Sequence, residues 1–157
     1  MRLNVGTDYG LRVLMFLMAE PGERAQVDRI AEVFSVSANH LNKVVQRLAR
    51  AGFIETFRGR SGGIALARRP RDINLGDVVL ALEADFGVVE CLLDEGTTCC
   101  LSPACHLRGI VREALEAFLE TFSKYTLADL AAPDLKRVLV PSLAAGPPDR
   151  TAIGDRT

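Results

Sequence analysis

The stretch Ser35-Val36-Ser37-Ala38-Asn39-His40-Leu41-Asn42-Lys43-Val44-Val45 joins two short segments whose apolar residues recur with the period of an α-helix. Residues 27–34 carry apolar side chains three and four positions apart, which predicts a short amphipathic helix. Residues 38–50 repeat this pattern, with Ser37 at the N-cap position and Gly52 as a natural terminator. Their buried face would consist of Leu41, Val44, Val45 and Leu48. Two short helices joined by a three-residue turn form a helix-turn-helix.

The second helix of this pair has a polar outer face that is rich in amides and cations. Its residues are Asn39, His40, Asn42, Lys43, Gln46, Arg47 and Arg50. Asparagine can read base edges in the major groove, whereas lysine and arginine bind guanine or phosphate. Any pair of antiparallel helices could show this pattern. We nevertheless expect DNA contacts from Ser37, Asn39, His40, Asn42, Lys43 and Arg47.

Residues 53–67 predict a β-hairpin, because two apolar runs flank the glycine-rich tip 59–63. Arg58, Arg60 and Ser61 lie at this tip. A narrow minor groove has a negative potential that attracts arginine. An ordinary surface hairpin is the alternative, but the position directly after a helix-turn-helix favours a DNA-binding wing.

Two further helices are expected on either side of this unit. The first would start at Thr7 or Asp8, both suitable N-cap residues, and end before Pro21-Gly22. Its apolar positions are Leu11, Leu14, Met15 and Met18. The second follows residues 73–76, and its apolar positions are Val78, Val79, Leu82 and Phe86.

All 4 cysteines fall within the segment 91–105, at Cys91, Cys99, Cys100 and Cys105. No signal peptide is visible, so we expect a reducing cytosol, which disfavours structural disulfides. Clustered thiols in a loop indicate a metal site or redox chemistry. A zinc site and a thiol that senses by oxidation are both open alternatives. The adjacent Cys99-Cys100 pair and the lack of any Cys-x-x-Cys make tetrahedral zinc awkward.

Ser102-Pro103 predicts the start of the longest helix, with serine as cap, proline in the first position and Cys105 in the first turn. The apolar face of this helix is formed by Leu107, Ile110, Val111, Ala114, Leu115, Phe118, Leu119 and Phe122. A chain of 157 residues has little other surface to cover such a stripe, so we expect a second copy to do so. Packing within one chain is the alternative.

Residues 126–130 predict one further helical turn, and a mobile tail is expected after it. Four of the 7 prolines lie from Pro133 onward. The predicted fold is mainly α. It comprises a winged helix-turn-helix DNA-binding part (1–71), a cysteine loop with a dimerisation helix (72–131) and the tail (132–157).

The composition is that of a folded protein, with 48% apolar and 25% charged residues, and no segment reaches the roughly 18 apolar residues of a membrane span. From Lys43 to Arg71 there are eight basic residues and one acidic residue, whereas residues 72–107 contain no lysine or arginine. The first half therefore suits a phosphate backbone. We find no catalytic Ser/His/Asp set and no phosphate loop, so no enzyme is expected.

Several of these segments together resemble the Rrf-type family of winged-helix transcriptional regulators. The resemblance covers about residues 1–131, and its motifs lie at 7–12, 39–45, 58–64, 76–79, 103–105 and 125–130. It implies an iron–sulfur cluster held by three cysteines, the last two separated by five residues. That spacing selects Cys99 and Cys105, with Cys91 as the first ligand and Cys100 as a spare thiol that could replace Cys99.

The fourth ligand separates branches of this family. One branch uses a histidine three residues after the last cysteine, but Arg108 stands there in this chain and cannot ligate. The nitric-oxide-sensing branch has an aspartate at the position of Asp8, which supplies an oxygen ligand from the partner subunit. The alternatives for Asp8 are a helix cap or an ion pair with Arg12, one turn later.

The resemblance therefore implies a cytoplasmic homodimeric repressor that binds a palindromic operator in double-stranded DNA. It would sense nitric oxide through the cluster, whose loss or nitrosylation weakens DNA binding. Three cysteines and one oxygen favour a 4Fe–4S cluster, and a 2Fe–2S cluster stays open. A sensor of iron or redox state within the same family is the main alternative.

Overall fold

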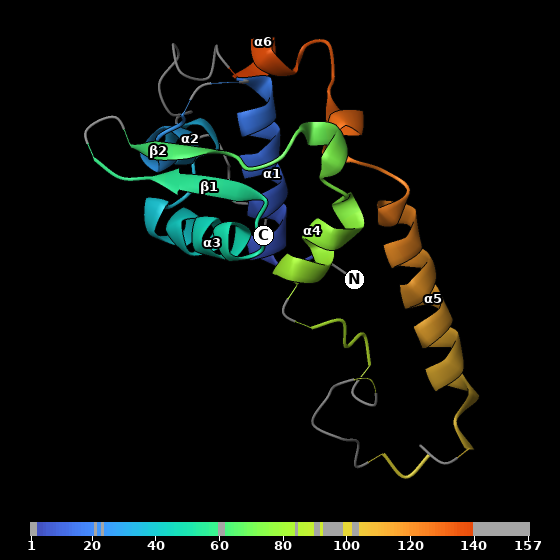
Figure 1. The fold of residues 1–157 in the computed structure, drawn as a ribbon. Coiled ribbons are helices and arrows are strands. Elements are labelled where there is room, and N and C mark those ends of the chain that lie inside the picture. Colours follow the sequence, from blue (N-terminus) through green and yellow to red (C-terminus); the bar gives the residue numbers. More distant parts are fainter. Residues whose placement is uncertain are drawn as a thin grey trace, which may run out of the picture.

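The computed structural model describes residues 3–20, 22, 24–59, 62–83, 85–89, 92, 99–101 and 104–139, and it is mainly helical (Figure 1). The α-helices are α1 (Val5–Ala19), α2 (Val27–Val33), α3 (Ala38–Arg50), α4 (Leu75–Leu82), α5 (His106–Ser123) and α6 (Leu135–Leu139). Two strands, β1 (Ile54–Phe57) and β2 (Gly63–Leu66), form an antiparallel hairpin. Short 3-10 helices lie at η1 (Pro70–Asp72) and η4 (Leu127–Leu130).

Helix α1 begins earlier than the sequence predicts. Its N-cap is Asn4, whose side-chain oxygen accepts a hydrogen bond from the Thr7 amide at 2.9 Å. The prediction of Thr7 or Asp8 as the cap is therefore wrong, and both residues lie inside the first turns of the helix. Asparagine is among the best N-cap residues because its short side chain reaches the unpaired amides of the first turn. The predicted end before Pro21-Gly22 is confirmed.

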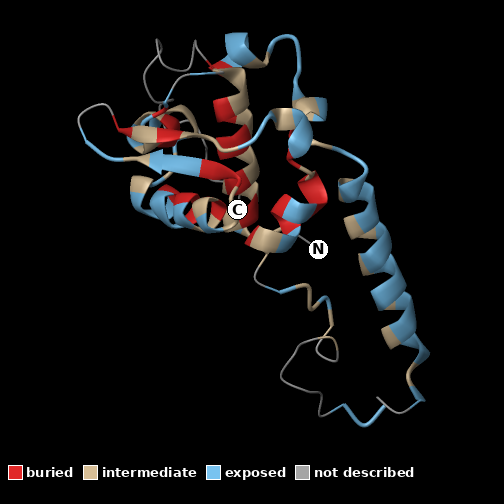
Figure 2. Cartoon of the chain, in the orientation of Figure 1, coloured by how far each residue is buried: buried red, intermediate tan, exposed pale blue. Residues whose placement is uncertain are grey.

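The helix-turn-helix is confirmed as α2 and α3. Its predicted inner face is buried, and the exposed fractions of Leu41, Val44, Val45 and Leu48 do not exceed 5%. Gly52 ends α3 with a φ of 73°, a conformation that glycine adopts without strain. Buried residues of α1, α3 and α4 form most of the core (Figure 2). Helix α3, the second helix of the helix-turn-helix, therefore packs on α1 and α4.

The hairpin is held against the body of the molecule at the start of β2. Ala25, just before α2, pairs with Ile64 through two backbone hydrogen bonds of 2.9 Å each. At the adjacent Gly63, φ is 143°, and an added Cβ would lie 2.8 Å from the carbonyl oxygen of Ala25. Only glycine fits this close approach to Ala25, so Gly63 allows the hairpin to pack against the segment before α2.

We predict that Gly63→Ala lowers the free energy of unfolding by about 1–3 kcal/mol, because it adds both backbone strain and a backbone clash. Urea unfolding of the variant would measure this. Gly59→Ala is the matched control on the same hairpin, since Gly59 has a φ of 98° but open space around its Cβ position. Equal costs for the two variants would show that the close approach to Ala25 contributes nothing.

Helices α4 and α5 differ from their predicted limits. Helix α4 ends at Leu82, so Phe86 lies outside it, half-buried in the connection that follows. Helix α5 starts at His106 and not at Ser102-Pro103, which lie outside the described residues. Cys105 is its N-cap residue, with extended backbone angles, and is not in the first turn. The Ala104 amide donates to the Leu101 carbonyl at 3.0 Å just before this helix start.

The C-terminal end of α5 is fixed to the start of α4. The Asn74 side chain donates to the Ser123 carbonyl at 2.8 Å, and the Leu75 amide donates to the Tyr125 carbonyl at 3.0 Å. The predicted turn at 126–130 is confirmed as η4, which a capping box of Thr126 and Asp129 opens. Hydrogen bonds from the Thr126 amide and then its hydroxyl lower the pKa of Asp129. The other end of α5 projects away from the body (Figure 1).

The predicted tail contains one short helix, α6. Its Leu139 is only 9% exposed and joins the core, and α6 contacts α1. Residues 140–157 lie outside the described residues, so their mobility stays a prediction. Among the described helices, none combines the length and the apolar character that a membrane crossing requires.

Candidate DNA interface and metal centre

The outer face of α3 presents its polar side chains to solvent. Asn39, His40, Asn42 and Lys43 are all exposed on it, and so is Ser37 at the N-cap. The Ser37 side chain makes no capping bond to α3, so its hydroxyl is not engaged by a helix amide. Five of the six residues of this helix-turn-helix that the sequence predicts as DNA contacts are thus exposed together.

Arg47 is the exception. It is half-buried, and its Nη2 donates to the Ala81 carbonyl in α4 at 3.3 Å. This bond directs the guanidinium towards α4 and links the two helices. Contact of Arg47 with DNA stays a prediction and would require this bond to be exchanged.

The predicted wing is the hairpin of β1 and β2. It follows α3 in the chain and lies beside it (Figure 1). Arg58 follows β1 directly and is exposed, whereas Arg60 and Ser61 lie outside the described residues. The Arg24 guanidinium lies 3.8 Å from the centre of the Phe57 ring, on the strand beside the tip. The Gln26 side chain also donates to the Gly62 carbonyl. These contacts hold the tip end of the hairpin, while Arg58 faces solvent.

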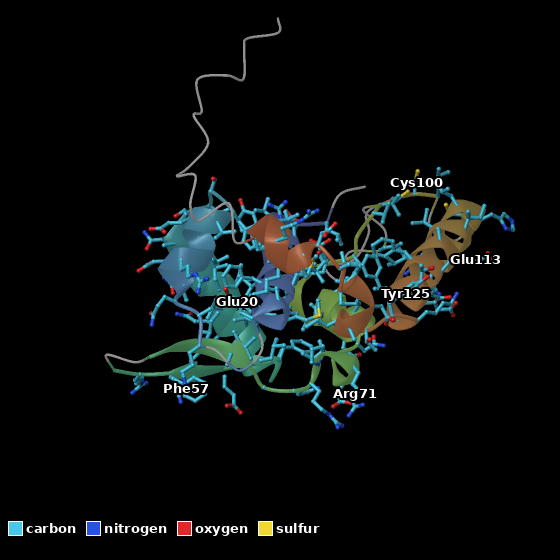
Figure 3. All side chains as sticks on the ribbon, turned by 90° about the horizontal axis from the view of Figure 1, so that it is seen from above. Glu20, Phe57, Arg71, Cys100, Glu113 and Tyr125 are labelled. Atoms are coloured by element: carbon cyan, nitrogen blue, oxygen red, sulfur yellow. The ribbon has the colours of Figure 1, made fainter. Side chains whose placement is uncertain are left out.

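The described cysteines lie at the opposite end of the molecule from the wing. Figure 3 shows Phe57 on the hairpin and Cys100 near the outer end of α5, far apart. Cys99 and Cys100 are exposed, Cys105 is half-buried, and Cys91 lies outside the described residues. Within the described parts of the chain, no three His, Cys, Asp or Glu side chains gather closely enough to hold a metal ion.

Asp8 belongs to no group of three possible metal ligands among the described residues. Its carboxylate accepts two hydrogen bonds from Arg12, at 3.1 Å from Nε and 2.7 Å from Nη2. The sequence allows Asp8 to be either a cluster ligand or the ion-pair partner of Arg12, and the single chain shows the ion pair. The pair borders a surface hollow of about 500 Å³, which is also lined by Leu3, Val5, Tyr9, Phe34, Ser35 and Val36.

The thiols suit an iron–sulfur cluster by their chemistry and their place in the fold. Thiolates are the usual ligands of such clusters. Cys105 immediately precedes an 18-residue helix, and the N-terminal end of a helix favours an anionic group by about 0.3–1 kcal/mol. Cys99 and Cys100 lie at the surface, where no packed core must open to admit iron.

The comparisons with known proteins decide the family. A model of the Rrf2 family, described as iron-dependent transcriptional regulators, matches residues 3–133. The chain belongs to the Rrf2 family. It is therefore a DNA-binding transcriptional regulator and not an enzyme, which confirms the resemblance of its motifs.

Several relatives carry the name HTH-type transcriptional regulator NsrR. The protein from Bacillus subtilis strain 168 is 51% identical over 131 residues, which cover 83% of this chain and 90% of that protein. The protein from Shouchella clausii strain KSM-K16 is 43% identical over 142 residues, with coverages of 88% and 95%.

Solved structures agree with the winged-helix fold. CymR, the global cysteine regulator of B. subtilis, is 27% identical, with a TM-score of 0.61 over 83% of this chain and 96% of that one. IscR from T. potens has a TM-score of 0.66 at 24% identity, with coverages of 83% and 85%, and supports the fold alone.

One group of contacts in this Rrf2 protein could not be predicted from its sequence. The carboxylate of Glu83, at the C-cap of α4, accepts hydrogen bonds from Asn4 and Thr7 at the start of α1. No local pattern pairs residues that are 76 positions apart. The one available signal was Asn4 as a strong N-cap candidate three residues before Thr7.

Proposed function

We propose that this Rrf2 protein is a homodimeric repressor whose binding to a palindromic operator responds to nitric oxide through an iron–sulfur cluster. The observation that carries the proposal is the group of cysteines at the outer end of α5 in a chain 51% identical to a regulator named NsrR. The ligands would be Cys91, Cys99 and Cys105 of one subunit and Asp8 of the other.

The exposed face of α3 supports sequence-specific DNA binding. A helix-turn-helix dimer places its two recognition helices in successive major grooves about 34 Å apart. Asn39, His40 and Asn42 would then face base edges, while Lys43 and Arg58 would face phosphates. Arg60 and Ser61 are the other predicted contact residues of the wing and lie outside the described residues.

Replacing Lys43 by alanine is expected to weaken binding to all DNA sequences alike. If Lys43 neutralises one phosphate in each subunit, the slope of log K against log salt should fall by about 0.9 for each phosphate that is no longer neutralised. Titration of one duplex at several salt concentrations measures this slope. Asn42→Ala is the matched control, because it should reduce discrimination between sequences and leave the slope unchanged. A Lys43→Ala slope equal to that of the wild type would remove Lys43 from the interface.

The apolar face of α5 supports a dimer. No described residue of this helix is buried, and Leu107 and Ile110 are 56% and 62% exposed. The face borders a hollow of about 500 Å³, lined by Val88, Ile110, Val111, Ala114, Leu115, Ala117, Phe118 and Thr121. Almost all of these side chains are apolar, which suits the same helix of a second copy.

In a dimer, Asp8 of one subunit would complete the ligand set of the other subunit's cysteines. The Asp8–Arg12 ion pair is about half exposed, at 46% and 43%, and exposed pairs contribute only about 0–1 kcal/mol. Its carboxylate can therefore turn towards a partner's loop in the adjoining hollow at small cost. When bound, the cluster would supply one iron held by the hard Asp8 oxygen in place of a soft thiolate, and this less strongly held iron would offer a site for nitric oxide.

Asp8→Ala is expected to shorten the lifetime of the cluster while it changes the stability of the metal-free protein by less than about 1 kcal/mol. The decay of the cluster absorbance under an anaerobic chelator measures the lifetime, and urea unfolding of the metal-free protein measures the stability. Asp28→Ala, which removes a carboxylate from the first turn of α2, is the control. Wild-type decay in Asp8→Ala would exclude Asp8 as a ligand.

Anaerobic purification followed by absorbance and native mass measurement tests the proposal. We expect a coloured dimer whose mass includes one iron–sulfur cluster per subunit, and the mass distinguishes a 4Fe–4S from a 2Fe–2S cluster. A colourless protein that contains zinc, or a metal-free protein that responds through thiol oxidation, would refute it.

A further inference from the structure

The end of α4 contacts two other helices through three successive residues. The Ala81 carbonyl accepts a hydrogen bond from Arg47 of the recognition helix at 3.3 Å. The Leu82 carbonyl accepts one from the Asn4 side chain at 3.3 Å. The Glu83 carboxylate accepts from the Asn4 amide at 3.1 Å and from the Thr7 hydroxyl at 2.6 Å. Residues 81–83 therefore connect α3 with α1.

The bond between Thr7 and Glu83 is the strongest of these contacts by its geometry. Thr7 is 0% exposed and is the one buried polar side chain in the described part of the chain. A hydroxyl that donates to a carboxylate at 2.6 Å makes a short, charge-assisted bond. The carboxylate also lies at the N-terminal end of α1, where the helix dipole favours negative charge.

Close packing makes this junction stiff. An added Cβ on Gly10 of α1 would lie 2.1 Å from Cδ1 of Leu82, so the two helices are in direct contact there. Leu82 is itself 0% exposed. Because packed interiors deform little, a displacement of the end of α4 must be passed on to α1.

The junction lies between the parts that the proposed function requires to communicate. Glu83 begins the connection that leads to the cysteines, Thr7 immediately precedes Asp8, and Arg47 belongs to the recognition helix. We propose that Thr7 and Glu83 are positioning residues whose hydrogen bond couples the state of the cysteine loop to the orientation of the recognition helix. This inference rests on the proposed function, because it requires DNA affinity to depend on the cluster.

The alternative role of this bond is to cap α1 and nothing more. A cap would stabilise the cluster-loaded and metal-free proteins equally, and its loss would leave the ratio of their DNA affinities unchanged. A coupling contact determines that ratio, which for allosteric proteins is about 5–150-fold. The ratio of affinities, measured beside thermal stability, therefore separates the two roles.

The experiment compares wild type, Thr7→Val and Glu83→Gln in cluster-loaded and metal-free forms. Valine has a shape close to that of threonine and lacks only the hydroxyl, and glutamine keeps one acceptor oxygen and lacks the charge. The probe is a duplex that the cluster-loaded wild type selects from a random-sequence pool. Thr126→Val is the matched control, because it removes a hydroxyl that bonds Asp129 in the η4 cap.

We expect both variants to bind cluster at the wild-type level while their cluster-loaded forms lose DNA affinity by at least about fivefold. The metal-free forms should match metal-free wild type, and Thr126→Val should keep the wild-type ratio. If Thr7→Val does not fold, Glu83→Gln carries the test. Wild-type ratios in folded variants, with a lowered melting temperature, would overturn the coupling and leave the proposed function intact. Equal affinities of the two wild-type forms would refute both.

Discussion

Replacing Cys99 or Cys105 by alanine is expected to abolish the iron–sulfur absorbance and to reduce operator affinity at least about hundredfold, towards non-specific binding. The fold should survive, because Cys99 is exposed and Cys105 is a half-buried cap residue outside the core. Iron and sulfide content, absorbance and operator affinity of anaerobically purified variants provide the measurement.

Cys100→Ala is the matched control for these variants. Cys100 is exposed in the same loop, next to Cys99, and the spacing to Cys105 excludes it from the proposed ligand set. We expect this variant to keep full absorbance and affinity. A coloured Cys99→Ala protein and a colourless Cys100→Ala protein would exchange the roles of the two thiols. Undiminished colour in Cys105→Ala would contradict the cluster assignment.

The second large effect is expected at α5. Ile110→Asp places a charge on the apolar face near its N-terminal end, and burial of an unpaired charge in a dimer interface costs several kcal/mol. The dimer dissociation constant should therefore rise at least about hundredfold. The fold of the monomer should be unaffected, since Ile110 is 62% exposed and lies outside the core cluster. Sedimentation over a range of protein concentrations measures the change.

Glu113→Lys is the control for this prediction. Glu113 is exposed on the polar side of α5, so reversal of its charge should leave the dimer intact (Figure 3). An Ile110→Asp protein that sediments as a dimer at low concentration would show that another surface joins the subunits. The exposed apolar face of α5 would then need a different explanation.

The winged helix-turn-helix could be predicted because each of its parts has a local signal. The face of Leu41 and Leu48 follows the helical period, and Gly52 and the glycine-rich tip end their elements by backbone chemistry. The caps were harder to predict. Thr7 and Asp8 are good cap residues, but the tertiary bond between Thr7 and Glu83 places them inside a helix that Asn4 opens.

The candidate site was predicted less completely, for physical reasons that differ between residues. Helical periodicity places Arg47 on the outer face of α3, but it cannot show that the Ala81 carbonyl approaches closely enough to bind it. Clustering identified the cysteines as a group, whereas the extended backbone of Cys105, which delays the start of α5, has no local signal in the sequence. The proposed ligand role of Asp8 requires a second chain, whose position cannot be predicted from one sequence.

The most direct test of the central claim is the operator affinity of the anaerobically purified dimer before and after stoichiometric nitric oxide. We expect the absorbance of the cluster to change and operator affinity to fall at least about tenfold in the same sample, within the usual range of allosteric coupling. Cluster absorbance that changes while operator affinity stays constant would contradict the claim that this protein senses nitric oxide through its cysteine loop.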